Sequence, residues 1–268
     1  MGDFITARHS FNSGDLITVL PGFQKVYLET GKKVLIYQRL GLPANYGHSD
    51  NHPIIDDNGQ MVCMNQPMFD MIKPLIEAQD YVAGFEIWQG EKVDFDFDLT
   101  RQHSQMPLPG GSIHHWASLI FPQLESDLTK PRVKPAFPRG TPVSQLVMIN
   151  RTARYYNPYI DFFFLKHFQS MLRFIGTYQE YESFNRRWLL NIEYLSVKDF
   201  KQLGDYISDC KFFLGNQSMC WHLADAIKSP RILEVCSTYP NTFPTGANGY
   251  SFITQTALEY QFNKLINE

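Results

Sequence analysis

The sequence has few cysteines, no long apolar run and no excess of basic residues. Its four cysteines, Cys63, Cys210, Cys220 and Cys236, form no C-x-x-C pair, so neither a zinc site nor a thioredoxin-type motif is indicated. We expect them to be buried, reduced thiols of a cytoplasmic protein. No apolar run approaches the roughly 18 residues that a membrane-spanning helix needs. The 24 Lys and Arg against 27 Asp and Glu argue against a general nucleic-acid binder, whose footprint is basic.

The motifs of several common enzyme classes are also missing. The chain contains no G-x-S-x-G, no Walker-type G-x-x-x-x-G-K-[ST] and no G-x-G-x-x-G. Two signals for metal binding are weak. Strict alternation places Asp94, Asp96 and Asp98 on one face of a strand, which most simply faces solvent. His114 and His115 are adjacent, so on a helix they point about 100° apart and make a poor pair of ligands. We therefore expect no metal site.

What the sequence has is material for a core, because 44% of its 268 residues are hydrophobic and 15% are aromatic. The length suits one large domain or two small ones. Strand, tight turn, helix and strand follow one another near the start, which is typical of a parallel sheet covered by helices. We expect strands over residues 4–11, 33–40, 81–88 and 93–99, helices over 15–30 and 113–124, and irregular chain over 41–80. Pro21 should kink the first of these helices.

The second half repeats this alternation after a segment rich in proline and basic residues. That segment, 126–144, is the best candidate for a linker. We expect strands over residues 145–150, 172–176, 192–195, 212–214 and 231–235, and helices over 178–188, 197–208, 218–227 and 252–265. The pattern predicts a second doubly wound sheet. The fold class is therefore α/β, with Rossmann-like domains over 1–125 and 145–250 and a terminal segment over 251–268.

The strongest candidate site follows the strand that ends at Gly215. A small polar turn comes next, and the hydroxyl of Ser218 can cap the helix that begins there. Free backbone N–H groups and the helix dipole at such a helix start attract phosphate. His222 lies one turn into the helix. An ordinary capped helix remains the other interpretation.

A second candidate is Asp15, directly after Gly14 in the turn between the first strand and its helix. Gly14 permits a tight turn, and Asp15 then lies at the helix start, at the carboxyl edge of the first sheet. The carboxylate there is either a helix cap or a general base facing a cleft between domains.

A third candidate is a pair of arginines, Arg151 and Arg154, just after the first strand of the second half. They should emerge at the same sheet edge as the turn at Gly215. Guanidinium groups at this edge could neutralise a diphosphate leaving group. The other interpretation is a solvated or salt-bridged pair.

Two segments together resemble the ADP-heptose:lipopolysaccharide heptosyltransferase family. They are Arg8…Ser13-Gly-Asp-Leu-Ile-x-x-Leu-Pro21 and Phe213-Leu-Gly-Asn-x-Ser-x-x-x-His-Leu-Ala224. The resemblance implies the GT-B fold, in which two Rossmann-like domains enclose the active site in a cleft between them. It also implies that the segment 251–268 packs back on the N-terminal domain.

The resemblance further implies roles for the candidate residues. Asp15 would be the catalytic base that activates the acceptor hydroxyl. A nucleotide diphosphate sugar would be bound by Gly14, Arg151, Arg154, Gly215, Asn216, Gln217, Ser218 and His222. Gln217 and Met219 stand where the family usually has Asp and Gly. Arg151 or Arg154 would replace the family's phosphate-binding lysine.

The function implied is that of an inverting, metal-independent glycosyltransferase that uses no cofactor besides its nucleotide-sugar donor. Its acceptor would carry a hydroxyl, on a glycan or a lipopolysaccharide-type molecule, and a peripheral position at a membrane stays open. One alternative is a catalytically degenerate nucleotide-sugar-binding protein, which Gln217 and Met219 favour. Another is a DNA-base-modifying glycosyltransferase of phage type, for which the basic linker is the motive.

Overall fold

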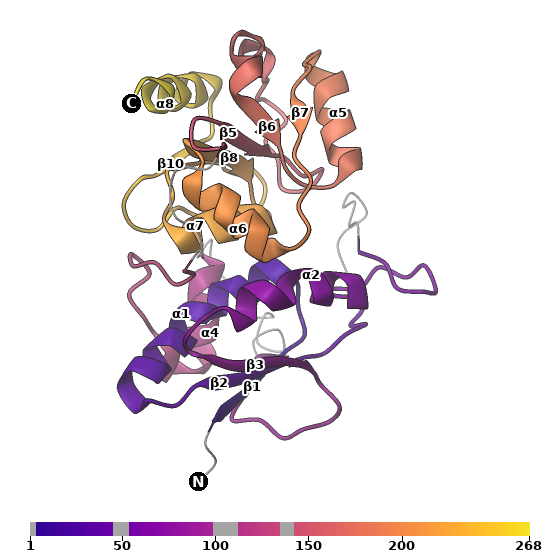
Figure 1. Cartoon of the computed structure of the whole chain (residues 1–268), viewed down its shortest axis with the longest axis vertical. Coiled ribbons are helices and arrows are strands. Elements are labelled where there is room, and N and C mark those ends of the chain that lie inside the picture. The colour runs from indigo at the N-terminus through magenta and orange to yellow at the C-terminus, as the bar shows by residue number, and fades with distance from the viewer. Residues whose placement is uncertain (1–3, 45–53, 99–111, 135–141) are drawn as a thin grey trace. The chain divides into compact units, whose positions relative to one another are not determined.

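The chain folds as two α/β units. The computed structural model describes residues 4–44, 54–98, 112–134 and 142–268. The first unit comprises Met1–Lys134 with Asp199–Lys201, and the second comprises Pro135–Lys198 with Gln202–Glu268. In Figure 1 the first unit runs from indigo to magenta and most of the second from rose to yellow. The predicted linker 126–144 spans this division, and part of it lies outside the described residues.

The sheet of the first unit is parallel, and its strand order is β3-β2-β1-β4. Its strands are β1 (Ile5–His9), β2 (Val34–Gln38), β3 (Val82–Ile87) and β4 (Phe95–Asp96). The helices are α1 (Ser13–Thr30), α2 (Gln66–Glu77) and α4 (Trp116–Ile120), with short 3₁₀ turns at Ile113–His115 and Pro122–Leu124. The strand order reverses direction between β1 and β4, which creates a crevice at the carboxyl ends of these two strands.

Helix α1 runs without interruption through Pro21, where the sequence predicted a kink. Its neighbour Gly22 packs against the turn at Leu124. A Cβ atom at position 22 would lie 2.8 Å from the Cβ atom of Leu124, so only glycine permits this approach. The helix ends at Gly31, whose φ of 72° is the left-handed conformation that the sequence predicted for a C-terminal cap.

The sheet of the second unit is also parallel and has the strand order β10-β9-β8-β5-β6-β7. Its strands are β5 (Val147–Asn150), β6 (Leu172–Phe174), β7 (Glu193–Tyr194), β8 (Phe212–Asn216), β9 (Arg231–Glu234) and β10 (Gly249–Phe252). Its helices are α5 (Tyr178–Trp188), α6 (Phe200–Asp209), α7 (Met219–Ile227) and α8 (Gln255–Asn267), with a 3₁₀ segment at Phe163–Met171. This is the Rossmann strand order, and it reverses between β5 and β8.

The terminal segment 251–268 differs from the expectation. Its first residues belong to strand β10, and helix α8 begins only at Gln255. The buried side chains of α8, Leu258, Phe262 and Leu265, join the hydrophobic core of the second unit, whereas the resemblance implied packing on the N-terminal domain. Phe262 makes ring contacts with Phe164, Phe168 and Phe212 at 5.0–5.3 Å between centroids.

Three other segments differ from the sequence prediction. The irregular region 41–80 contains helix α2, with Pro67 near its start and Pro74 inside it. The predicted strand 93–99 is reduced to Phe95–Asp96. The predicted helix 113–124 is broken into two 3₁₀ turns around the short α4, because Pro122 interrupts it.

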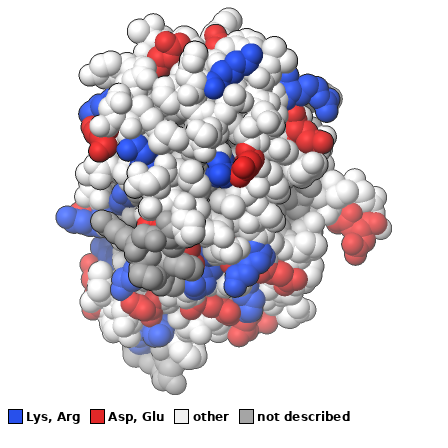
Figure 2. Space-filling model, turned by 45° about the horizontal axis from the view of Figure 1, so that its top comes forward, with Lys and Arg blue, Asp and Glu red and all other residues white. Residues whose placement is uncertain are grey.

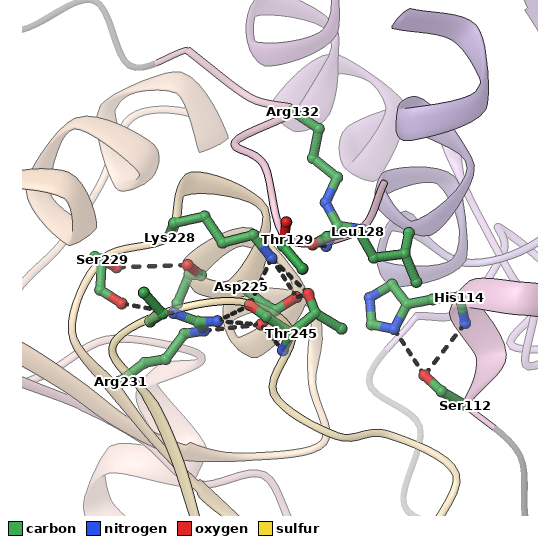
Figure 3. A network of polar contacts seen from close by, with 12 residues as sticks. Ser112, His114, Leu128, Thr129, Arg132, Asp225, Lys228, Ser229, Arg231 and Thr245 are labelled. Atoms are coloured by element: carbon green, nitrogen blue, oxygen red, sulfur yellow. Dashed lines mark hydrogen bonds and ion pairs between the residues drawn. The ribbon is translucent and has the colours of Figure 1, made fainter. Parts of the chain in front are cut away.

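A buried polar network fixes the chain that follows β9. Figure 3 shows Asp225 of α7 surrounded by Lys228, Arg231 and Thr245. The guanidinium of Arg231 lies 2.7 Å from the carboxylate of Asp225, and neither residue is exposed. The backbone N–H and hydroxyl of Thr245 donate to the same carboxylate at 2.9 Å and 2.6 Å. The network therefore ties helix α7 and strand β9 to the loop that precedes β10.

The face drawn in Figure 2 shows Lys and Arg side chains beside Asp and Glu side chains, without a large basic area. Nothing on this face favours the DNA-modifying alternative, which needs a basic footprint. Within the described ranges, no helix combines the length and the apolar character needed to cross a bilayer.

Candidate functional site

The carboxyl edge of the second sheet is organised around one hydrogen bond between strands β5 and β8. The hydroxyl of Ser218, two residues after β8, donates to Oδ1 of Asn150 at 2.7 Å. Nδ2 of Asn150 donates in turn to the carbonyl of Ile175, just after β6, at 2.8 Å. Because the strand order reverses between β5 and β8, these contacts lie where open α/β sheets bind their ligands.

Gly215 keeps the two central strands close at this edge. It pairs with Asn150 across the sheet. A Cβ atom at position 215 would lie 2.8 Å from the carbonyl oxygen of Asn150 and 2.7 Å from the ring of Phe213. Any larger residue would push the strands apart, so the role of Gly215 in the structure is to leave room for the backbone.

Helix α7 begins at this edge with open backbone N–H groups. The hydroxyl of Ser218 accepts from the N–H of Trp221 at 3.2 Å, as the sequence predicted for a helix cap. The N–H groups of Met219 and Cys220 donate to no other residue in the described part of the chain. Met219 is partly exposed. Two N–H groups and the positive end of the helix dipole are therefore available to an anion.

The two amide side chains of the turn hold neighbouring loops. Asn216, which is fully buried, accepts from the N–H of Thr152 at 2.9 Å and donates to the carbonyl of Arg154 at 2.6 Å. Gln217 accepts from the N–H of Cys236 at 3.1 Å and donates to the carbonyl of Tyr239 at 3.1 Å. Both residues were predicted to bind the donor, and in the structure their side chains hold the loops on either side of the crevice.

Arg151 is occupied by a buried partner. Its Nε and Nη2 atoms donate to the carboxylate of Glu234 at 2.7 Å and 2.8 Å. The side chains of Arg151 and Glu234 are 8% and 1% exposed, and the same carboxylate accepts from the N–H of Asn157 at 2.6 Å. Of the two interpretations that the sequence left open for Arg151, the geometry matches the salt-bridged one. The bidentate pair ties the end of β5 to the end of β9.

Glu180 is a residue that the sequence analysis missed. It lies in the first turn of α5, where its carboxylate accepts from the N–H of Thr177 at 3.1 Å. Burial raises the pKa of Glu180 above its ordinary value of 4.5, against the opposing effects of the Thr177 hydrogen bonds and the charge of Arg154. The signal was present in the sequence, because Thr177-x-x-Glu180 is a capping-box pattern that directly follows a strand.

Glu180 lies close to Asn150 at the end of β5 and to Cys220 in α7. A Cβ atom at Gly176 would lie 3.1 Å from its Oε2 atom and 2.7 Å from Nδ2 of Asn150. Its charge also contributes to raising the pKa of Cys220, although burial is the larger cause. Arg154, the second predicted arginine, therefore belongs with Glu180 at this edge.

Helix α7 also carries Cys220 and His222. Burial raises the pKa of the Cys220 thiol to about 12, although a helix start by itself favours the thiolate. All four cysteines are buried, and none of them forms a disulfide, as the sequence predicted. His222 is 6% exposed, and its backbone N–H donates to the carbonyl of Ser218 at 3.1 Å, as expected inside a helix.

In the first unit, Asp15 lies in the first turn of α1. Its Oδ2 atom accepts from the backbone N–H of Asn12 at 3.2 Å and from the Asn12 side chain at 3.1 Å. No partner of its Oδ1 atom is present among the described residues. Asp15 lines a hollow at the carboxyl edge of the first sheet. Its carboxylate thus supports the helix start with one oxygen and faces this hollow. Gly14 lies beside it in α1, in a different unit from the other predicted donor-binding residues.

The three alternating aspartates all have partners in the first sheet, and of the three only Asp94 is exposed as the sequence predicted. Oδ2 of Asp94 accepts from the N–H of Thr6 at 2.8 Å. Asp96 forms a bidentate pair with Arg8, at 3.0 Å and 2.6 Å, and Asp98 lies 3.3 Å from the same guanidinium. The neighbouring strand β1 places Arg8 opposite them, which alternation within one strand cannot show. Among the described side chains, no group of three or more His, Cys, Asp or Glu residues is arranged to hold a metal.

Comparison with solved structures gives the fold family. No protein-family model matches the sequence, and no curated protein matches it either. The heptosyltransferase WaaC of E. coli, solved with ADP, has a TM-score of 0.64 to this chain at 10% identity, over 97% of this chain and 99% of its own. The ADP-heptose LPS heptosyltransferase II of E. coli has a TM-score of 0.57 at 12% identity, over 98% of both chains.

A glycosyltransferase of family 9 from Veillonella parvula has a TM-score of 0.56 at 8% identity, over 98% of this chain and 89% of its own. The chain has the heptosyltransferase fold. The α/β fold class that the alternation of strands and helices predicted is confirmed, and so is the resemblance at the level of fold, because each match spans nearly the whole chain.

Proposed function

We propose that this protein transfers a sugar from a nucleotide diphosphate sugar to a hydroxyl group, with inversion and without a metal ion. The observation that carries the proposal is the start of α7, which presents open N–H groups at the point where the second sheet reverses. It occurs in a fold shared with heptosyltransferases, one of which has been solved with ADP. Open backbone N–H groups and the positive end of a helix dipole stabilise the negative charge of a diphosphate leaving group.

The donor would bind at the second sheet. Its diphosphate would accept from the N–H groups of Met219 and Cys220, and Arg154 would supply positive charge nearby. Glu180 accepts hydrogen bonds, so it would bind hydroxyl groups of the donor. Three further residues would act indirectly, because they hold the loops beside the crevice in place: Arg151, Asn216 and Gln217.

The reaction would occur at Asp15 of the first unit. The acceptor hydroxyl gives its proton to the carboxylate while its oxygen forms a bond to the anomeric carbon. The bond from that carbon to the diphosphate breaks on the opposite face, and the nucleoside diphosphate leaves with the electron pair. The positive end of α7 would stabilise the charge that develops on the leaving oxygen.

Replacement of Met219 by proline tests the proposed diphosphate site. Met219 is the first residue of α7, where proline is favoured and removes only the backbone N–H. We expect Met219→Pro to weaken ADP binding about tenfold, the value of one hydrogen bond to a charged group, and Met219→Ala to leave it unchanged.

Calorimetry with ADP, UDP and GDP, each against its monophosphate, gives the binding constants. Equal binding by both variants would contradict the diphosphate site, and so would equal affinity for mono- and diphosphates. Transfer that survives EDTA would support a reaction without a metal. Donor binding without transfer to any acceptor would match the degenerate alternative.

A further inference from the structure

Four large apolar side chains of the second unit are exposed, and they come from three parts of the chain. Tyr159 precedes the 3₁₀ segment that begins at Phe163, Leu189 follows α5, and Ile253 lies just before α8. Their exposed fractions, in chain order, are 86%, 45%, 68% and 55%. Single exposed hydrophobic residues are ordinary on a protein surface, whereas a contiguous group of them marks a binding surface.

Two hydrogen bonds hold the stretch around Tyr159 against the residues that lead into α8. Nδ2 of Asn157 donates to the carbonyl of Ile253 at 2.8 Å. The N–H of Asp161 donates to Oε1 of Gln255 at 3.0 Å. Tyr159 lies between these two contacts in the sequence, so the exposed side chains of Tyr159 and Ile253 belong to one region of the surface.

The same stretch contacts the end of α5 through Phe163. The ring of Phe163 lies edge-on to that of Trp188, the last residue of α5, at 5.3 Å between centroids. Leu189 follows Trp188 directly, and the N–H of Asn191 donates to Oε1 of Gln169 in the 3₁₀ segment at 2.5 Å. The exposed side chains are therefore brought together from all three parts of the chain. We call this surface the apolar patch, and it consists of Tyr159, Phe163, Leu189 and Ile253.

Leu189 is unfavourable for the fold at its own position. Its φ of 51° is a left-handed conformation at the C-terminal cap of α5, where glycine and asparagine are the residues with the least steric strain. Its side chain is 68% exposed, so packing inside the protein does not offset this strain. A strained residue that presents an apolar side chain to solvent indicates a role outside the fold.

Basic side chains lie beside the apolar patch. Nζ of Lys166 is 5.8 Å from the centre of the Phe163 ring, and Cζ of Arg187 is 4.8 Å from the centre of the Trp188 ring. Lys166, Arg187 and the adjacent Arg186 are exposed. Such side chains lay their aliphatic stems along apolar surface while the charged ends reach outwards. The whole chain has a net charge of −3, so its composition does not account for this local positive charge.

We infer that the apolar patch docks the protein on a membrane that contains anionic lipids. The four apolar side chains would enter the boundary between headgroups and acyl chains, and the basic side chains would meet lipid phosphates. A second copy of this chain fits less well, because a twofold interface would place each arginine near its own counterpart. This surface is independent of the proposed sugar transfer, since none of its residues is assigned to the donor or to the reaction.

Vesicle flotation with the full chain tests this inference. Vesicles of phosphatidylcholine are compared with vesicles that also contain phosphatidylglycerol, at low and at high salt. Leu189→Asn removes an apolar side chain at a position whose backbone conformation suits asparagine, so the midpoint of urea denaturation should not fall. Leu28→Asn is the matched control, because Leu28 is 75% exposed on α1 of the first unit. Arg187→Gln removes one of the basic charges and provides a second variant if Leu189→Asn proves unstable.

We expect the wild type to float with the anionic vesicles and to be released at high salt. Leu189→Asn should weaken this binding about tenfold and Arg187→Gln about fivefold, whereas Leu28→Asn should leave it unchanged. The inference is overturned if the wild type floats with neither kind of vesicle or equally with both. It is also overturned if Leu189→Asn and Arg187→Gln bind as the wild type does, or if Leu28→Asn weakens binding as much as Leu189→Asn. A wild-type dimer that Leu189→Asn converts to a monomer in sedimentation would overturn it too, because the patch would then join two copies.

Discussion

The hydroxyl of Ser218 and the amide oxygen of Asn150 lie 2.7 Å apart, and this contact joins the two strands between which the second sheet reverses. Ser218 also caps α7, so one hydroxyl positions both the helix start and the strand ends. The contribution of this hydrogen bond to the free energy of unfolding can be measured.

Ser218→Ala should lower the free energy of unfolding by about 2 kcal/mol, because it removes a helix cap and the partner of a buried amide. Thr254→Ala is the matched control. Thr254 caps α8 through the N–H of Ala257 at an exposed position, and its loss should cost about 1 kcal/mol. Urea denaturation measures both values. Equal costs would show that the bond to Asn150 contributes nothing.

Asp15→Asn should reduce the rate of transfer by about 10²–10⁴-fold and leave ADP binding unchanged, because an amide cannot take the proton. Asparagine retains an oxygen for the contact with Asn12 that supports the helix start. The rate is measured from nucleoside diphosphate released in the presence of acceptor. Transfer at the wild-type rate would show that another group is the base.

Glu180→Gln should change how stability depends on pH. Burial raises the pKa of Glu180 in the folded protein, so its protonated form favours folding. That contribution is complete below the unfolded pKa and is lost as the pH rises through the folded one. The variant should therefore gain stability relative to the wild type as the pH rises above about 4.

Denaturation at several pH values provides the measurement. Glu182→Gln is the control, because Glu182 is an exposed residue of the same helix. A difference between Glu180→Gln and the wild type that does not vary with pH would mean that the carboxyl is equally solvated in both states.

Asp225→Asn should lower the free energy of unfolding by about 3–5 kcal/mol, because it removes the negative charge that pairs with the buried Arg231 and with Lys228. Glu29→Gln, which breaks the exposed pair with Lys25, should cost less than about 0.5 kcal/mol. Thermal and chemical denaturation compare the two. A cost below about 1 kcal/mol for Asp225→Asn would contradict an unsolvated network.

The sequence was sufficient for the fold class, because periodicity alone separates strands from helices when they alternate regularly. It was insufficient for α2. This helix contains Pro67 and Pro74 and lies in a stretch rich in turn-forming residues, so the pattern indicates irregular chain there. Pro67 occupies the first turn, where proline is tolerated, and Asn65 supplies the cap. A rule that treats every proline as a helix-breaking residue cannot tell a proline in the first turn of a helix from one that ends it.

The sequence predicted the sheet edge at which Arg151 and Gly215 lie, but not the partners of the side chains there. The partner of Arg151, Glu234, lies 83 residues further along the chain. No local spacing could show that this arginine is neutralised. Glu180 was detectable, because its capping box follows a strand, but a capping box by itself indicates only a helix start.

The way in which Asn216 and Gln217 hold their loops has a consequence for how this protein can evolve. Their contacts with residues 152–155 and with Cys236 and Tyr239 are mostly to backbone atoms. Loop side chains can therefore be exchanged while the loop backbones keep their paths. Under the proposed function, mutation of these loop side chains would change which nucleotide or sugar is recognised without a penalty in folding, so substrate choice would change faster than the fold.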